Sequence, residues 1–253
     1  MSNSYRQDQI YAYIVRKGSA SVTELADTFQ VTTTTIRRDL LGLEAQDVIY
    51  RTRGSAYLRG YGYGKAEVRD NLLSGEKKRI AAAAARYVKP NSSIIMDSGS
   101  STSVLTDHLL REFPHDNLDF ITHSLNHAAK LSKRFNVSLP GGSLTPNTEF
   151  LIGLNAENFY QKINADIAFL GSNGVRNCNG LTISYPDQIQ VKQYATLCAE
   201  KRIALLDSSK FNQRGVYVFC DFKELDVLIT VETEENKAQL ERIADLGVEI
   251  VLV

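Results

Sequence analysis

The chain has 253 residues, of which 43% are hydrophobic and 23% charged, so it can bury a core without help from disulfides or metals. Basic and acidic residues balance at 29 each, so the net charge neither indicates nor excludes a nucleic-acid partner. Three scattered cysteines argue against a disulfide framework. The polar N-terminus and the lack of a long apolar run predict a cytoplasmic protein with no membrane partner.

Residues 1–58 predict a winged helix-turn-helix domain. Ser21 to Glu24 fits a capping box that opens a second helix, and Thr32 is expected to cap a third. Asp39 on the third helix is expected to pair with an arginine or to cap locally. The expected elements are helices at Tyr5–Lys17, from Val22 and from Thr33 to about Ala45, then strands at Val48–Thr52 and Ser55–Leu58.

A helix, a tight turn and a second helix place that second helix in the major groove of DNA. Its first turn carries short hydroxyl side chains suited to base edges, two arginines follow, and two more stand on the hairpin. We therefore expect double-stranded operator DNA as a partner. A plain helical domain with a solvated arginine surface is the alternative. The predicted DNA-binding residues are Thr33, Thr34, Thr35, Arg37, Arg38, Arg51 and Arg53.

Residues 59–74 are rich in glycine and polar groups and predict a linker. From residue 75 to 253, strands and helices alternate, which predicts an α/β domain with a mostly parallel sheet. The expected strands are Ser93–Asp97, Leu118–Thr122, Val137–Leu139, Asp166–Gly171, Ile203–Asp207, Val227–Thr230 and Val248–Val253. The expected helices are Glu76–Val88, Thr102–Glu112, Leu125–Lys133, Asp187–Glu200 and Glu234–Asp245.

A strand at Ile94–Asp97 runs into a Gly/Ser/Thr loop and then a helix, an arrangement that suits a phosphate group. Ligands of open α/β sheets bind beyond the carboxyl ends of the strands. Four other loops share that edge, although any one of them alone reads as an ordinary strand-to-helix turn. Lys210 is a natural counter-charge, Asp97 could hold sugar hydroxyls, and His123 stands at a strand end. The four loops are Thr122–Ser124, Gly141-Gly142, Gly171–Gly174 and Asp207–Lys210.

Val22–Glu44 resembles the signature of the DeoR family of bacterial sugar-metabolism repressors, and the match continues through Arg51 and Gly54. The family usually has His-Gly-Gly-Ala where this chain has Arg53-Gly54-Ser55-Ala56. The second half resembles the DeoR-type sensor domain, whose fold is similar to ribose-5-phosphate isomerase. Its landmarks here are Glu76-Lys77, Asp97–Thr102, Gly141-Gly142, Gly171, Gly174, Gly180–Thr182, Lys192 and Asp207–Phe211.

The resemblance implies a repressor of a carbohydrate-utilisation operon, controlled by a phosphorylated sugar or polyol. It implies that Ser100, Ser101 and Thr102 bind the phosphate. Two copies would bind half-sites of the operator, so we expect a homo-oligomer, a dimer or a tetramer. The full predicted ligand-binding set is Asp97, Ser98, Gly99, Ser100, Ser101, Thr102, His123, Gly141, Gly142, Asn173, Asp187 and Lys210.

Two alternatives compete with this interpretation. A sugar-phosphate isomerase would need a carboxylate base, which Asp187 could supply, but Asn173 cannot ionise where the isomerases have an aspartate. A metal site could use His123 and His127, four residues apart, but no third ligand follows at a useful spacing. We therefore expect no catalysis, no metal and no cofactor.

Overall fold

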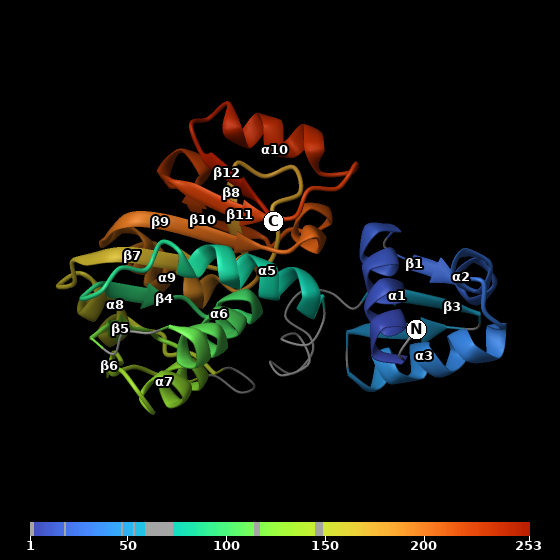
Figure 1. The fold of residues 1–253 in the computed structure, drawn as a ribbon, viewed down its shortest axis with the longest axis horizontal. Coiled ribbons are helices and arrows are strands. Elements are labelled where there is room, and N and C mark those ends of the chain that lie inside the picture. The colour runs from blue at the N-terminus through green and yellow to red at the C-terminus, as the bar shows by residue number, and fades with distance from the viewer. Residues whose placement is uncertain are drawn as a thin grey trace. The chain divides into compact units, whose positions relative to one another are not determined.

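The computed structural model describes residues 3–17, 19–46, 48–52, 54–58, 73–113, 117–144 and 149–253. The chain divides into two compact units, residues 1–74 and 75–253 (Figure 1). Of the predicted linker, residues 59–72 lie outside the described part of the chain.

The described part of the first unit has three helices and a three-stranded antiparallel sheet in the order β1-β3-β2. Ile10, Leu25, Ile36 and Leu40 are fully buried in its core. The elements are α1 (Asn3–Lys17), β1 (Ser19–Ser21), α2 (Val22–Phe29), α3 (Thr33–Ala45), β2 (Ile49–Thr52) and β3 (Ser55–Leu58). This is the predicted winged arrangement, with a third strand added by the short β1.

Both predicted helix caps of the first unit are confirmed. The Ser21 hydroxyl accepts from the Glu24 backbone N–H at 3.1 Å, and the Glu24 carboxylate accepts from the Ser21 N–H at 3.3 Å. The Thr32 hydroxyl accepts from the Thr35 N–H at 3.2 Å. These bonds satisfy donors that the first helical turn leaves unpaired, so α2 and α3 begin at defined residues.

The second unit contains a seven-stranded parallel sheet in the order β12-β11-β9-β7-β4-β5-β6. The predicted fold class, an N-terminal helix-turn-helix unit and a C-terminal parallel α/β unit, is therefore confirmed. The strands are β4 (Ser93–Met96), β5 (Asp119–Ile121), β6 (Asn136–Ser138), β7 (Ala165–Leu170), β9 (Ala199–Leu206), β11 (Val227–Thr230) and β12 (Glu249–Leu252).

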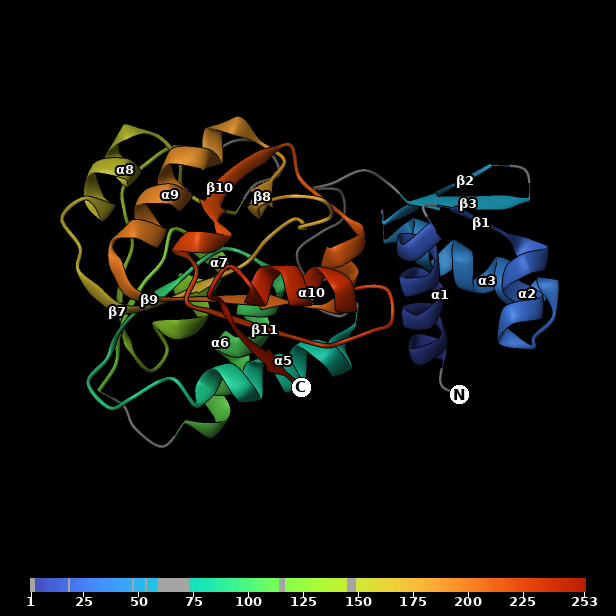
Figure 2. The same ribbon diagram turned by 90° about the horizontal axis from the view of Figure 1, so that it is seen from above.

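Helices cover both faces of this sheet, with α8, α9 and a small ribbon on one side and α5 and α6 on the other (Figure 2). Successive side chains of β4 point to opposite faces of the sheet. Ile95 packs in the hydrophobic layer under α8 and α9, and Ile94 and Met96 pack in the layer under α5 and α6. The helices are α5 (Ser74–Ala85), α6 (Ser100–Glu112), α7 (Leu125–Leu131), α8 (Leu154–Tyr160), α9 (Ile189–Leu197) and α10 (Lys237–Ala244), with short 3-10 turns η1 (Pro186–Gln188), η2 (Ser208–Asn212) and η3 (Phe222–Glu224).

The ribbon consists of β8 (Gly180–Ile183) and β10 (Tyr217–Asp221), which pair antiparallel and were not predicted. The two segments approach very closely. A Cβ atom at Gly180 would lie 2.1 Å from the Cys220 carbonyl oxygen, so only glycine fits there. The ribbon buries Leu181 and Phe219 in the hydrophobic cluster on this face of the sheet.

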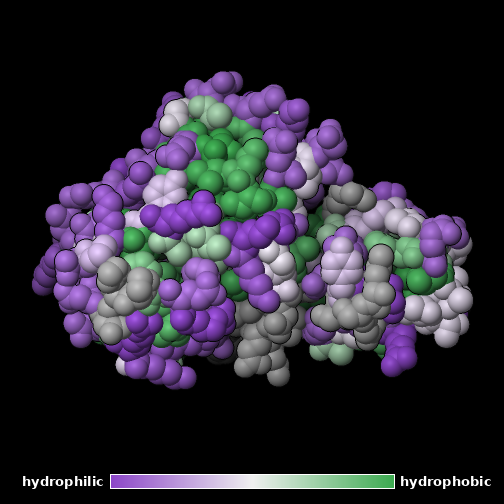
Figure 3. Space-filling view, in the orientation of Figure 1, coloured by the Kyte–Doolittle hydropathy of each residue, from purple (hydrophilic) through white to green (hydrophobic). Residues whose placement is uncertain are grey.

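The strand β12 lies at one edge of the sheet. Hydrophobic side chains gather on the surface over this part of the unit (Figure 3). Leu246 and Leu252 are about half exposed. Among the described residues, no strand pairs with the outer edge of β12.

Candidate functional site

The predicted recognition helix, α3, displays its polar face to solvent. Thr34, Arg37 and Arg38 are exposed, and Thr33 and Thr35 are half-buried. Within the described part of the chain, neither arginine forms an ion pair. The Thr35 hydroxyl lies 2.9 Å from that of Thr32, so it belongs partly to the helix cap. Two cations and a threonine are therefore available to a partner outside the chain.

The opposite face of α3 is held by a buried ion pair. The Arg6 guanidinium of α1 donates from Nε to Asp39 Oδ2 at 2.6 Å and from Nη2 to Oδ1 at 3.1 Å. Asp39 is completely buried, between the core residues Ile36 and Leu40 along the helix. The expectation that Asp39 pairs with an arginine is confirmed, and this bidentate contact fixes the rotation of α3 against α1.

The wing is tied to the end of α3. Arg51 in β2 donates from Nε to Glu44 Oε2 at 2.6 Å, and its backbone N–H donates to Glu44 Oε1 at 3.2 Å. Arg51 therefore shares its charge with Glu44, although its side chain is still 29% exposed. The Tyr50 and Tyr57 rings stack across β2 and β3 with centroids 5.2 Å apart. Arg53 lies outside the described residues.

In the α/β unit, Asp97 directly follows β4 and is the centre of a buried charge network. Its oxygens accept from the backbone N–H groups of Ser98 at 2.8 Å and Gly171 at 2.9 Å. Lys192 Nζ lies 2.7 Å and 2.5 Å from the two oxygens, and His123 Nε2 lies 3.3 Å from Oδ1. Every acceptor position of this carboxylate is therefore engaged within the protein.

The network continues away from Asp97. His123 Nδ1 lies 3.0 Å from the Tyr160 hydroxyl of α8, and Lys192 Nζ lies 4.7 Å from the centre of the Phe219 ring. Burial alone would raise the pKa of Asp97, but the charge of Lys192 and the contact with His123 hold it below its usual range. Asp97 is thus a buried anion whose role includes holding Lys192 and His123 in place.

The loop from Ser98 to Thr102 opens α6, which runs for 13 residues. Ser98, Gly99 and Ser100 are partly exposed, whereas Ser101 and Thr102 are buried. The Thr102 hydroxyl lies 2.7 Å from the Asp97 carbonyl oxygen and 2.9 Å from that of Gly99, so it holds the turn closed. The loop presents its exposed part at the positive end of a long helix.

A second loop, Asp207 to Lys210, follows β9 at the same edge. Asp207 is buried and caps η2, accepting from the Ser209 N–H at 3.1 Å. Burial would raise the pKa of Asp207, but the charges of Lys210 and Lys77 lower it. Two cations thus surround one fixed anion, and the partly exposed Lys210 is within reach of solvent.

This second loop is also attached to the first helix of the α/β unit. Glu76 in the first turn of α5 accepts from the Ser208 backbone N–H at 2.8 Å and from the Ser208 hydroxyl at 2.9 Å. Burial and the nearby Asp207 charge raise the pKa of Glu76, partly offset by these bonds. Glu76 therefore joins the start of α5 to the loop that carries Lys210.

The remaining predicted residues lie at other strand ends. Gly141 and Gly142 follow β6, Asn173 follows β7, and Asp187 is exposed in η1. The Asn173 side chain accepts from the Ser184 N–H at 2.9 Å, which ties it to the end of β8. Among the described residues, no hydrogen bond joins Asp187 to the Asp97 network.

Sequence reasoning listed Lys192 only as a landmark and did not include Tyr160. Both reach Asp97 or His123 from distant parts of the chain, so no local pattern marks them. No cluster of three His, Cys, Asp or Glu side chains suited to a metal occurs in the described part of the chain.

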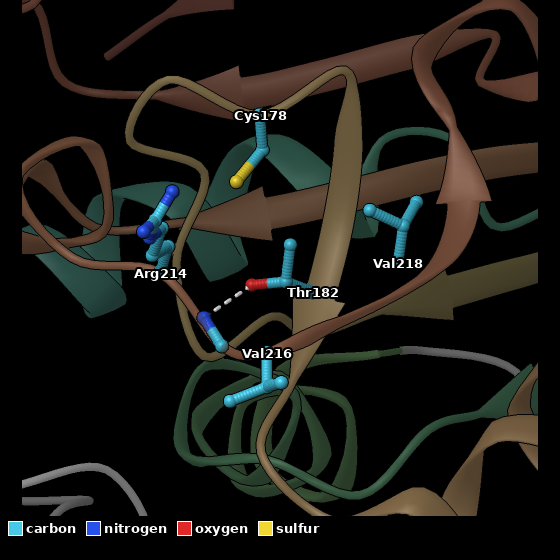
Figure 4. A pocket seen from close by; sticks show the side chains of 6 residues that line it. Cys178, Thr182, Arg214, Val216 and Val218 are labelled. Atoms are coloured by element: carbon cyan, nitrogen blue, oxygen red, sulfur yellow. Dashed lines mark hydrogen bonds between the residues drawn. The ribbon is translucent and has the colours of Figure 1, made fainter.

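A cavity of about 310 Å³ lies against the β8–β10 ribbon (Figure 4), lined by Cys178, Thr182, Arg214, Gly215, Val216 and Val218. Its buried hydroxyl, on Thr182, accepts from the Gly215 N–H at 2.6 Å and contacts the Gly174 carbonyl oxygen at 2.5 Å. This polar group needs no further partner, and none of the predicted ligand-binding residues lines the cavity.

An exposed arginine-bearing helix in a winged unit, joined to an α/β unit with polar loops at one sheet edge, defines a class of DNA-binding transcriptional regulators with a sensor domain. Residues 6–59 match the family model of the DeoR-like helix-turn-helix domain, and residues 73–232 match that of the DeoR C terminal sensor domain. The chain therefore belongs to the DeoR family.

Relatives over nearly the whole chain are transcriptional regulators. The HTH-type transcriptional regulator GlpR of Haloferax volcanii is 31% identical over 97% of this chain and 96% of its own length. The HTH-type transcriptional regulator GolR of Listeria innocua is 30% identical over 97% and 96%. The glycerol-3-phosphate regulon repressor of Haemophilus influenzae is 26% identical over 93% and 92%.

Among solved structures, a D-ribose-5-phosphate isomerase in complex with phospho-erythronic acid is similar over 54% of this chain and 53% of its own. The identity is 15% and the TM-score 0.41, so no activity is carried over from it. None of the helices described here is both long and apolar enough to span a lipid bilayer.

Proposed function

We propose that this protein is a cytoplasmic repressor of a carbohydrate-utilisation operon, controlled by a phosphorylated sugar or polyol. The observation that carries this proposal is the exposed pair Arg37 and Arg38 on a helix whose other face is locked by Asp39 and Arg6. The names of the relatives support both the regulatory role and a small carbohydrate-derived effector. The proposed role involves no catalysis.

At the DNA, α3 enters the major groove with Thr33, Thr34 and Thr35 toward base edges. Arg37 and Arg38 contact phosphate oxygens or a guanine edge. Arg51 and Arg53 of the wing meet the sugar-phosphate backbone or the minor groove, with the wing oriented by the contact of Arg51 with Glu44. A homodimer or homotetramer would place two such helices on one side of the duplex.

At the sheet edge, the phosphate of the effector binds the Ser98–Ser101 loop at the start of α6, opposite the ammonium group of Lys210. The helix end and the cation both favour an anion there. The sugar or polyol part extends toward His123, the Gly141-Gly142 turn, Asn173 and Asp187. Asp97 and Thr102, whose polar atoms are already engaged, shape the site by holding Lys192 and the loop.

Glu76 can couple effector binding to DNA affinity. It holds Ser208, two residues before Lys210, and it belongs to the helix that directly follows the linker at residues 59–74. A phosphate that draws Lys210 inward would shift Ser208 and with it the start of α5. A coupling of about 1–3 kcal/mol would change the DNA affinity roughly 5- to 150-fold.

The test is the double variant Ser100→Ala/Lys210→Ala. We expect it to bind operator DNA as the wild type does but to show neither thermal stabilisation by sugar and polyol phosphates nor any change of DNA affinity with them. The matched control is Ser132→Ala/Lys133→Ala, a serine and a lysine exposed elsewhere on the same unit. A normal effector response in the Ser100/Lys210 variant would show that the phosphate binds elsewhere.

A further inference from the structure

Three buried side-chain polar atoms have no hydrogen-bond partner in the described part of the chain: His127 Nδ1, Ser184 Oγ and Gln213 Nε2. His127 is in the helix after β5, Gln213 ends the loop after β9, and Ser184 is bonded to Asn173 after β7. His127 therefore stands at the sheet edge where the effector is proposed to bind, whereas Ser184 follows β8 of the ribbon and Gln213 follows η2. Unpaired buried polar atoms are rare in native proteins and call for a missing partner.

His127 is the most closely defined of the three. It lies in the first turn of α7, where its backbone N–H donates to the Ser124 cap at 3.3 Å, and its side chain is 2% exposed. The backbone of Gly99, the residue before α6, lies beside the ring, and Asp97, His123 and Lys130 are the charged or titratable groups around it. His127 thus lies between the phosphate loop and the Asp97 network.

The charge state of the His127 ring follows from its surroundings. Burial lowers the pKa of His127 to about 4, so the ring is neutral near pH 7, with one N–H donor and one lone-pair acceptor. Nδ1 is one of these two groups, and no group in the described part of the chain bonds it.

We infer that His127 Nδ1 forms a hydrogen bond with a hydroxyl of the effector, which makes His127 a specificity-determining residue absent from the predicted set. This inference rests on the proposed function. It selects sugar or polyol phosphates with a free hydroxyl close to the phosphate, since Gly99 belongs to the phosphate loop. An anion without a hydroxyl cannot make this contact.

A purely structural role for the His127 ring is disfavoured by the bonds around Gly99. The Gly99 carbonyl oxygen already lies within 2.9 Å of both the Thr102 hydroxyl and the Ser103 N–H. Loss of the imidazole therefore leaves that oxygen satisfied. A leucine at position 127 would also remove a buried polar atom that is unpaired in the effector-free protein.

The experiment compares wild type, His127→Leu and His127→Asn in the full chain. Thermal unfolding is measured without any added ligand. Binding is then measured by calorimetry for glycerol 3-phosphate, ribose 5-phosphate, glucose 6-phosphate, fructose 1-phosphate and sulfate, the last being an anion without a hydroxyl. Asparagine keeps a hydrogen-bonding amide near the position of Nδ1, whereas leucine keeps only bulk.

We expect His127→Leu to unfold at the wild-type temperature or above it without ligand. It should bind the tightest of the four sugar and polyol phosphates at least tenfold more weakly than wild type, with sulfate binding unchanged. His127→Asn should stay within about threefold of wild type.

A clearly lower unfolding temperature of ligand-free His127→Leu, or wild-type affinity for the sugar phosphate in this variant, would overturn the inference. Wild-type protein that binds none of the four phosphates would count against the proposed function, and the unfolding temperatures would still decide the role of His127.

Discussion

The two units expose their functional groups in opposite ways. On α3, Thr34, Arg37 and Arg38 point into solvent, and the packing behind them, through Asp39 and Arg6, only sets their direction. At the sheet edge of the α/β unit, the predicted residues Asp97, Thr102 and His123 are buried and already bonded to other groups. The side chains on the DNA-binding face are exposed and can contact a partner directly. At the sensor edge, a ligand has to bind beside side chains that are already hydrogen-bonded to one another.

The largest expected effect follows from breaking that network. Asp97→Asn leaves the Lys192 charge buried without a counter-ion, which typically costs about 3–5 kcal/mol. Urea unfolding should show this loss in residues 75–253 and leave the unfolding of the DNA-binding unit unchanged. The control Asp187→Asn removes an exposed carboxylate and should change stability by less than about 0.5 kcal/mol. If Asp97→Asn were as stable as wild type, the buried network would not stabilise the sensor unit, and the contrast drawn above between the two units would be wrong.

The next effect belongs to the exposed face. Arg37→Ala/Arg38→Ala should weaken operator binding by about 2–4 kcal/mol, roughly 30- to 700-fold, because both cations meet DNA directly. Unfolding of both units should remain as in wild type, since neither side chain packs on the core. Fluorescence anisotropy with labelled duplex measures the affinity, and Arg242→Ala on α10 is an exposed-arginine control. Undiminished DNA binding would mean that α3 is not the contact helix.

A pH effect of about 2 kcal/mol is expected from His127. The unfolded chain takes up a proton at this residue below about pH 6.5, but the folded protein does so only near pH 4. Its contribution is therefore fully present above pH 6.5 and is lost as the pH falls toward 4, by about 2 kcal/mol between pH 6.5 and 5. Urea unfolding of wild type and His127→Leu over this range isolates the contribution, and equal pH slopes in both proteins would contradict it.

The smallest effect concerns the start of α2. Ser21→Ala removes the cap on the Glu24 N–H and should destabilise the DNA-binding unit by about 1 kcal/mol. Ser21→Asp keeps an acceptor and should stay close to wild type. Circular dichroism during thermal unfolding of the first unit measures both. A lower unfolding temperature of the sensor unit in Ser21→Ala would indicate that the two units do not unfold separately.

The same contrast explains what the sequence could predict. The caps at Ser21 and Thr32 and the apolar face of α3 depend on residues a few positions apart, so periodicity and local hydrogen bonding suffice. The strands of the parallel sheet were found for the same reason, and each observed boundary lies within four residues of the prediction. The ribbon of β8 and β10 was missed because its pairing depends on a close approach at Gly180 that only the folded chain produces.

The sensor network could be predicted only in part. The loop after β4 and the lysine after β9 carry local signals of an anion site. Lys192 reaches Asp97 across 95 positions, and Glu76 reaches Ser208 across 132, so no spacing rule links them. The helix α8, which supplies Tyr160, has two buried residues and is too short to show a period. Contacts between buried residues that lie far apart in the sequence depend on tertiary packing, so they could not be predicted from local patterns.

The central claim is that an exposed helix binds duplex DNA under the control of a phosphate-bearing ligand at the sheet edge. Its most direct test is selection of genomic fragments by the purified protein, repeated with each sugar or polyol phosphate and with its unphosphorylated parent. We predict enrichment of a small set of duplex sequences, changed by at least one phosphate and not by its parent compound. Recovery of no enriched duplex, or an enrichment that no phosphate alters, would contradict the account.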